Sequence, residues 1–199
     1  MFLILLVAIV LSRVTRSIYA SPIPKLPIDV LGNVMFMRLA ILVMLVERRP
    51  KGIGFGFIPT RSEFKVGILY FFFLLPICFT LAWGLGILRF PVRHPGWSAL
   101  AVLAGMFWVV ALSEEFFFRG ILQQWAGRIT GSRAVGLVLT SALFGLCHLW
   151  FGKFPNWRMA LVAGVAGLFY GLAFQKAGGI RASMVSHALT ATAFRVLFS

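Results

Sequence analysis

Long hydrophobic runs alternate with short polar stretches along the whole chain. A helix that crosses a bilayer needs about 20 apolar residues, and four runs approach or exceed that length. These stronger runs are residues 66–88, 99–124, 134–151 and 158–176. Weaker runs predict three further helices at residues 1–20, 29–46 and 182–198. The pattern predicts an all-α protein, a polytopic membrane helical bundle of about 6–7 transmembrane helices.

Two of the weaker runs allow other interpretations. Residues 1–20 contain Arg13 and Arg16 and end near a faint signal-peptidase pattern, but we expect a first span rather than a cleaved signal. Residues 29–46 are short for a span and could lie in the membrane interface instead. The largest hydrophilic stretch, residues 47–65, is expected to form a loop at the membrane surface.

Composition supports a membrane location and excludes other classes. Of the 199 residues, 60% are hydrophobic and only 12% are charged, whereas soluble domains carry about a quarter charged residues. The net charge is +14, but the basic residues punctuate apolar segments, a pattern suited to a phospholipid bilayer and not to nucleic acid. The two cysteines, Cys78 and Cys147, form no disulfide or zinc pattern. We expect an integral membrane protein of the bacterial inner (cytoplasmic) membrane.

Two adjacent acidic residues, Glu114 and Glu115, lie in the middle of the hydrophobic run 99–124. The whole chain has only five acidic residues. A charge at membrane depth costs about 2.5–3.5 kcal/mol on insertion scales, so such residues are usually functional. A structural polar contact between helices is the simpler alternative, but that contact does not require a second acid.

Helical spacing gives the two glutamates different neighbours. Arg119 lies four residues after Glu115, on the same helix face and in the favourable order for an ion pair. Glu114 lies about 100° around the helix and has no such partner on its own helix. We therefore expect two carboxylates in two environments, with two roles.

Two histidines, His148 and His187, add polar groups from two other predicted helices. Three chemistries fit this set. Glu114 could act as a general base on water with help from a histidine, which would be peptide hydrolysis. Zinc bound by Glu114, His148 and His187 could activate the water, although the HExxH signature is absent. The same residues could also form the proton relay of a transporter.

Three segments resemble motifs of the CPBP family, the CAAX proteases and bacteriocin-processing enzymes, also called the Abi family. Residues 114–120, Glu-Glu-Phe-Phe-Phe-Arg-Gly, are similar to its EExxFRG motif. Residues 144–148, Phe-Gly-Leu-Cys-His, match its FxxxH motif, and His187 resembles the start of its HxxxN or HxxxD motif. The three occur in the family's order, and the resemblance covers the chain from about residue 99 onward.

The resemblance implies a glutamate-dependent intramembrane protease that hydrolyses a peptide bond in a membrane-borne protein or peptide substrate. Glu114 would be the base that activates water, and His148 would orient or activate that water. Glu115 and Arg119 would support the site. His187 would belong to the side that polarises the substrate and stabilises the oxyanion.

The resemblance also bears on organisation and cofactors. Phe144 is a supporting residue of the second motif. Residues 1–98 would be N-terminal membrane helices with a basic surface loop, and residues 99–199 a CPBP-like catalytic core within one continuous membrane domain. We expect no cofactor and no metal, with zinc as the alternative.

One position departs from the family pattern. The family places Asn or Asp four residues after the last histidine, where this chain has Ala191. We expect the helix to turn the flanking Thr190 and Thr192 away from the His187 face. Ala191 leaves open a subfamily with another donor, a weaker enzyme, or a non-catalytic member that acts as a membrane scaffold or immunity protein.

Overall fold

The computed structural model describes residues 38–39, 42–43, 46, 58–88 and 96–197. The chain divides into two units, Met1–Arg48 and Arg49–Ser199. The predicted helix at 1–20, most of that at 29–46 and most of the predicted loop at 47–65 lie outside the described residues. The number of six to seven spans therefore stays a prediction.

The first described helix, α4, runs from Arg61 to Gly84 and begins five residues earlier than the hydrophobic run. Its start is set by a capping box. The Thr60 side chain accepts a hydrogen bond from the Glu63 backbone, and the Glu63 carboxylate accepts one from the Thr60 backbone. These bonds satisfy backbone groups that the first turn of a helix leaves unpaired. Extending the predicted surface loop to residue 65 was therefore wrong, because residues 61–65 are helical.

The glutamate pair lies in a continuous helical stretch from Ser98 to Thr130. In chain order its parts are α5 (Ser98–Gly105), η2 (Met106–Ala111), α6 (Leu112–Glu115), η3 (Phe116–Gln123) and α7 (Gln124–Thr130). The two η segments are π-helical, with wider turns than an α-helix. The stretch continues past the predicted end at residue 124 and stops where Gly131 adopts a positive φ of 69°.

The remaining helices match the predicted runs closely. They are α8 (Arg133–Cys147), the short 3₁₀ segment η4 (His148–Trp150), α9 (Trp157–Ala177) and α10 (Ile180–Leu197). Ser132 caps α8 and Asn156 caps α9, each through a side-chain oxygen that accepts a backbone N–H. Gly178, with φ of 73°, ends α9.

The described part of the chain is helical, and four of its helices are long and apolar enough to cross a membrane. These are Arg61–Gly84, Ser98–Thr130, Arg133–Trp150 and Trp157–Ala177. The predicted span at 182–198 is confirmed as a helix, but α10 is not among these four. Many large apolar side chains of α4 and α8 are exposed, including Phe72, Trp83 and Val138, which suits a lipid environment. The protein is an integral membrane protein.

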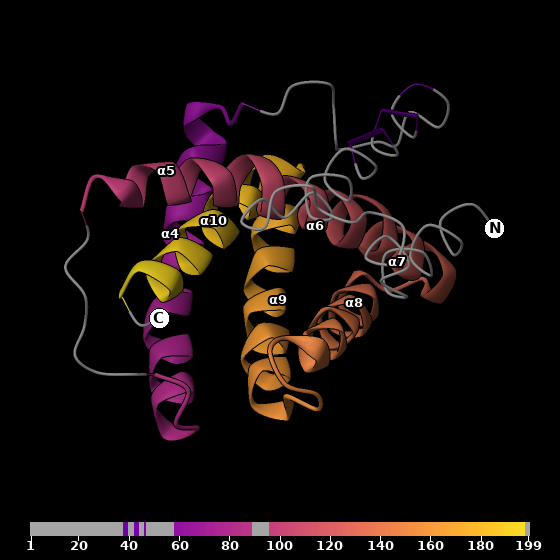
Figure 1. Ribbon diagram of the computed structural model, residues 1–199. Coiled ribbons are helices and arrows are strands. Elements are labelled where there is room, and N and C mark those ends of the chain that lie inside the picture. The colour runs from indigo at the N-terminus through magenta and orange to yellow at the C-terminus, as the bar shows by residue number, and fades with distance from the viewer. Residues whose placement is uncertain (1–37, 40–41, 44–45, 47–57, 89–95, 198–199) are drawn as a thin grey trace. The chain divides into compact units, whose positions relative to one another are not determined.

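Helices α4, α9 and α10 pack together, and α8 packs against the other side of α9 (Figure 1). Small residues permit close approach at these contacts. A Cβ added at Gly67 of α4 would lie 2.6 Å from the Ala182 carbonyl oxygen of α10. A Cβ added at Gly145 of α8 would lie 2.6 Å from the Ala160 carbonyl oxygen of α9. Glycine is therefore required at both crossings, as is typical of membrane helix interfaces.

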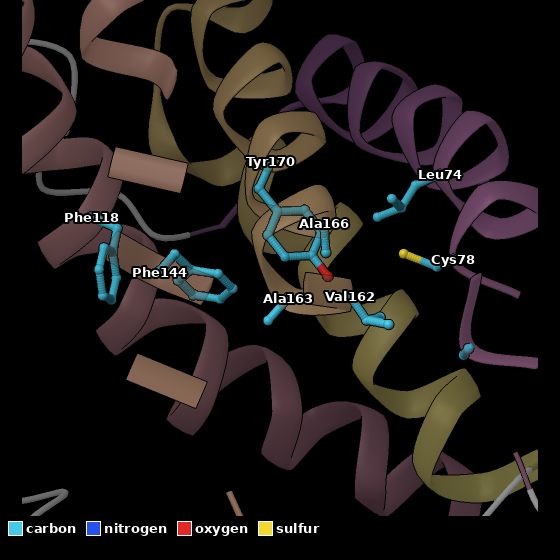
Figure 2. Packing of buried hydrophobic residues seen from close by; sticks show 9 residues of the cluster. Leu74, Cys78, Phe118, Phe144, Val162, Ala163, Ala166 and Tyr170 are labelled. Carbon is cyan, nitrogen blue, oxygen red and sulfur yellow. The ribbon is translucent and has the colours of Figure 1, made fainter. Parts of the chain in front are cut away.

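A buried hydrophobic cluster joins α4 and α9 to the segments that carry the glutamates and His148 (Figure 2). Its members are Leu74, Cys78, Ala82, Phe118, Phe144, Val162, Ala163, Ala166 and Tyr170. In Figure 2 the rings of Phe118, Phe144 and Tyr170 lie next to one another at one side of the cluster. These three rings form the apolar floor beneath the polar residues of the candidate active site.

Candidate active site

The glutamate pair ends the short segment α6, which lies between the two π-helical segments η2 and η3. A π-helical turn widens the backbone and changes the direction of the side chains that follow it, and such turns often occur at functional sites. Arg119 and Gln123 follow in η3 at intervals of four residues. Arg119 and Gln123 both reach backbone carbonyls of α9, whereas Glu115 contacts His187 of α10.

The predicted ion pair between Glu115 and Arg119 is confirmed. Arg119 Nη1 donates to Glu115 Oε1 at 3.0 Å, and both side chains are 0% exposed. Arg119 Nη2 donates to the Gly167 carbonyl oxygen at 3.0 Å, which ties the pair to α9. The guanidinium also lies 4.6 Å from the centre of the Phe144 ring, a cation–π arrangement. The buried charges are therefore paired and held from two helices.

His187 of α10 faces both carboxylates. Its Nδ1 lies 2.7 Å from Glu115 Oε1, and its Nε2 lies 3.8 Å from Glu114 Oε2. Because Glu115 is paired with Arg119 and can only accept when ionised, His187 Nδ1 is assigned as the donor. Nε2 is then the nitrogen that faces Glu114, at a separation too long for a hydrogen bond.

The two glutamates differ in exposure. The side chain of Glu115 is fully buried, whereas that of Glu114 is 33% exposed. Glu114 Oε2 is itself buried and has no hydrogen-bond partner among the described residues. Glu114 therefore has one oxygen directed toward His187 and a side chain that is still open to a small molecule.

Phe144 lies at the centre of the site. Its ring centre is 4.8 Å from that of His148 and 5.8 Å from that of His187, with the His187 ring edge-on. His148 Nδ1 is 2.8 Å from the Phe144 carbonyl oxygen, so Nδ1 donates and Nε2 is left as an acceptor. The structure thus brings all six predicted site residues into one connected group: Phe144, Glu114, Glu115, Arg119, His148 and His187.

Comparison with known proteins identifies the matching stretch. The family model for type II CAAX prenyl endopeptidase Rce1-like proteins matches residues 95–193. This part of the chain is an Rce1-like domain. Neither a search of curated proteins nor a search of solved structures gives a match. The Rce1-like domain contains Phe144 and the five polar residues grouped with it.

Helix α4 lies before the Rce1-like domain in sequence but is packed against it. Arg181 Nε donates to Glu63 Oε1 at 2.8 Å, which joins the first turn of α4 to the first turn of α10. The hydrophobic cluster in Figure 2 also includes Leu74 and Cys78 of α4. The Rce1-like domain therefore shares its core with a helix that the sequence analysis assigned to the N-terminal part.

The Rce1-like domain contains site residues that sequence reasoning missed. Gln123 Nε2 donates to the Gly171 carbonyl oxygen at 3.2 Å, one turn beyond the bond from Arg119 to Gly167. The spacing of four residues from Glu115 through Arg119 to Gln123 could have revealed it. Tyr170 stacks on His187 with ring centres 4.6 Å apart, and no local pattern in the sequence signals that contact.

The orientation of Thr190, expected to turn away from the His187 face, stays a prediction. Thr190 Oγ1 donates to the Ser186 carbonyl oxygen at 2.8 Å, within α10 itself. Ala191, the departure from the family motif, follows directly.

A metal site is not assembled by the described residues. No group of three or more His, Cys, Asp or Glu side chains in residues 58–88 and 96–197 is arranged to hold a metal ion. The proposed zinc ligands Glu114, His148 and His187 do not form such a group.

Proposed function

We propose that this protein is an intramembrane endopeptidase that hydrolyses a peptide bond in a membrane-associated protein or peptide. One observation carries the proposal: the fold places two adjacent carboxylates in different environments. Glu115 is sealed and paired with Arg119, whereas Glu114 is partly open and faces a histidine nitrogen. Membership of the matched region in the Rce1-like family supports the same reaction class.

In the proposed reaction, Glu114 removes a proton from water, and the resulting hydroxide attacks the peptide carbonyl carbon. His187 Nε2 donates a hydrogen bond to the carbonyl oxygen as negative charge develops there. Glu114 then delivers its proton to the leaving nitrogen as the carbon–nitrogen bond breaks. The products are a carboxylic acid and an amine, and Glu114 returns to its ionised form.

In this role His187 uses a proton on each ring nitrogen, one on Nδ1 for Glu115 and one on Nε2 for the substrate. Glu115 thereby positions His187 through Nδ1 and leaves the proton on Nε2 available to the substrate.

His148 completes the proposed site from the side of α8. Its Nδ1 proton is engaged by the Phe144 carbonyl, so its Nε2 lone pair can accept a hydrogen bond from the attacking water. The half-buried position of His148 at the end of α8 is compatible with entry of water there.

Ala191 supports a second candidate, a non-catalytic member of the same family that binds a membrane peptide or protein. Loss of an oxyanion donor costs about 10²–10³ in rate in other hydrolases. A chain with Ala191 could then retain the binding surface without useful turnover. Nothing in the described residues favours the transporter hypothesis over these two.

The deciding experiment compares membrane-associated peptides and protein termini by mass spectrometry in cells that express wild type or Glu114→Gln. Glu63→Gln serves as the matched control, because Glu63 is another buried glutamate of the same chain but belongs to the ion pair with Arg181. We expect a precursor that accumulates uncut only in the Glu114→Gln cells.

Identical termini in all three strains, under conditions where deletion of the protein has a phenotype, would contradict proteolysis. If Glu114→Gln also preserved that phenotype, the binding hypothesis would replace it. The type of membrane that contains the protein in its native cell stays a prediction.

A further inference from the structure

Tyr170 holds one face of the His187 ring. The two rings are stacked with an interplanar angle of 10° and a centroid distance of 4.6 Å. Tyr170 is buried, and its own ring is packed edge-on against Phe144 at 6.1 Å. The stack therefore fixes the plane of the imidazole, while the bond to Glu115 fixes its rotation within that plane.

We propose that Tyr170 is a positioning residue that holds His187 Nε2 toward Glu114 in a chain whose motif has Ala191 instead of a polar residue. The inference rests on the proposed function, and it assigns Tyr170 a role through His187 and no contact with substrate. An alanine one turn after His187 cannot hydrogen-bond to the ring or to the substrate. The stacked ring of Tyr170 restrains the histidine from α9, beside the hydrogen bond to Glu115.

The geometry explains why this restraint matters. Nε2 is 3.8 Å from Glu114 Oε2, so it has no hydrogen bond there that could fix its direction. Rotation of the imidazole about the bond to Glu115 would move Nε2 away from the carboxylate. Misplacement of a reacting group by about 1 Å can lower a rate about 10²-fold.

Nitrogen NMR of the histidine rings tests the inference without a substrate. The chain has only three histidines, so ¹⁵N ring signals in lipid nanodiscs can be assigned by substituting each one in turn. In the wild type we expect two separate His187 signals from one fixed ring. In Tyr170→Leu we expect those signals to shift and broaden as the ring becomes mobile.

Matched variants separate the stack from general packing. Phe169→Leu removes a neighbouring aromatic ring of α9 that also packs against the hydrophobic cluster, and it should leave the His187 signals unchanged. Tyr170→Phe keeps the stacked ring and removes only the hydroxyl, so it should leave the His187 signals close to those of the wild type.

Cleavage of the precursor found in the termini comparison gives the second readout. We expect Tyr170→Leu to lower kcat about 10-fold with KM changed less than about 2-fold, because the ring orients a catalytic group and does not bind substrate. Unchanged His187 signals in folded Tyr170→Leu, or in Tyr170→Met if the leucine variant does not fold, would overturn the positioning role. If the wild type itself cleaved no precursor, the proposed function would be contradicted. The NMR result on the His187 ring would still stand.

Discussion

Two glutamate–arginine pairs in this protein have opposite characters. Glu63 and Arg181 join the first turns of α4 and α10, and Arg181 is 26% exposed. Both Glu63 oxygens are used, because Oε1 accepts from Arg181 and Oε2 accepts from the backbone and the hydroxyl of Thr60. This pair is saturated, and it connects two helices.

The pair of Glu115 and Arg119 is fully buried and leaves hydrogen-bonding capacity unused. Glu115 Oε1 accepts from both Arg119 and His187, while Oε2 is buried and has no partner among the described residues. Arg119 Nε and the adjacent Glu114 Oε2 are unpaired in the same way. Structural networks normally satisfy such atoms, so the difference between the two pairs agrees with the proposed active site.

Removing the arginine of the buried pair should have the largest effect on stability. Arg119→Ala leaves the Glu115 carboxylate without its cation and the Gly167 carbonyl without its donor, so we expect a loss of about 3–5 kcal/mol in unfolding free energy. Reversible unfolding in bicelles would measure it. Arg181→Ala is the matched comparison, and an equal loss there would contradict the distinction between the two pairs.

Adding one methyl group beside the buried pair should have a smaller effect. A Cβ at Gly167 would lie 3.2 Å from Arg119 Nη2 and 3.3 Å from Phe144 Cδ1. We expect Gly167→Ala to lower the unfolding free energy by about 1–2 kcal/mol, because overpacking exceeds the gain in helix propensity. Gly105→Ala is the control, since no neighbouring atom lies within 4 Å of its added Cβ. Equal unfolding midpoints for the two variants would show that the Glu115–Arg119 pair can shift to accommodate the added methyl group without loss of stability.

Local features of this protein can be predicted from its sequence to different extents. The Glu115–Arg119 pair follows from helical spacing alone, because the interaction is local. The four stronger hydrophobic runs predict four helices correctly, because lipid exposure imposes long apolar segments. The early start of α4 was missed although Thr60 and Glu63 form a recognisable capping box.

Other features depend on contacts between segments far apart in the chain. Nothing in the apolar run 99–124 distinguishes its π-helical turns from α-helix, because both use the same side chains. The stack of Tyr170 on His187 depends on how α9 and α10 pack, and the same is true of the bond from Gln123 to Gly171. The sequence identifies which polar residues are unusual, whereas the partners of those residues are set by helix packing.

The saturated pair should behave as a stabilising contact with no part in chemistry. We expect Glu63→Gln to lower the unfolding free energy by about 1 kcal/mol, because a charged partner of Arg181 and one side of the capping box are weakened. Cleavage should stay within about 2-fold of wild type, since Glu63 is at the start of α4 and outside the catalytic group. Reversible unfolding in bicelles would measure the stability of Glu63→Gln, and mass spectrometry of protein termini would measure its cleavage activity. A large loss of cleavage would place α4 in the mechanism.

The smallest effect on stability is expected at the residue with the largest role in the proposed chemistry. Glu114→Gln removes a charge whose buried Oε2 has no hydrogen-bond partner, so the unfolding free energy should stay within about 0.5 kcal/mol of wild type or rise. Removal of the general base should nevertheless lower cleavage by about 10²–10⁴-fold. Unfolding in bicelles and mass spectrometry of termini give the two values for one variant. A destabilisation as large as that of Arg119→Ala would mean that Glu114 is a structural member of the buried network, and the proposed division of roles between the two glutamates would then fail.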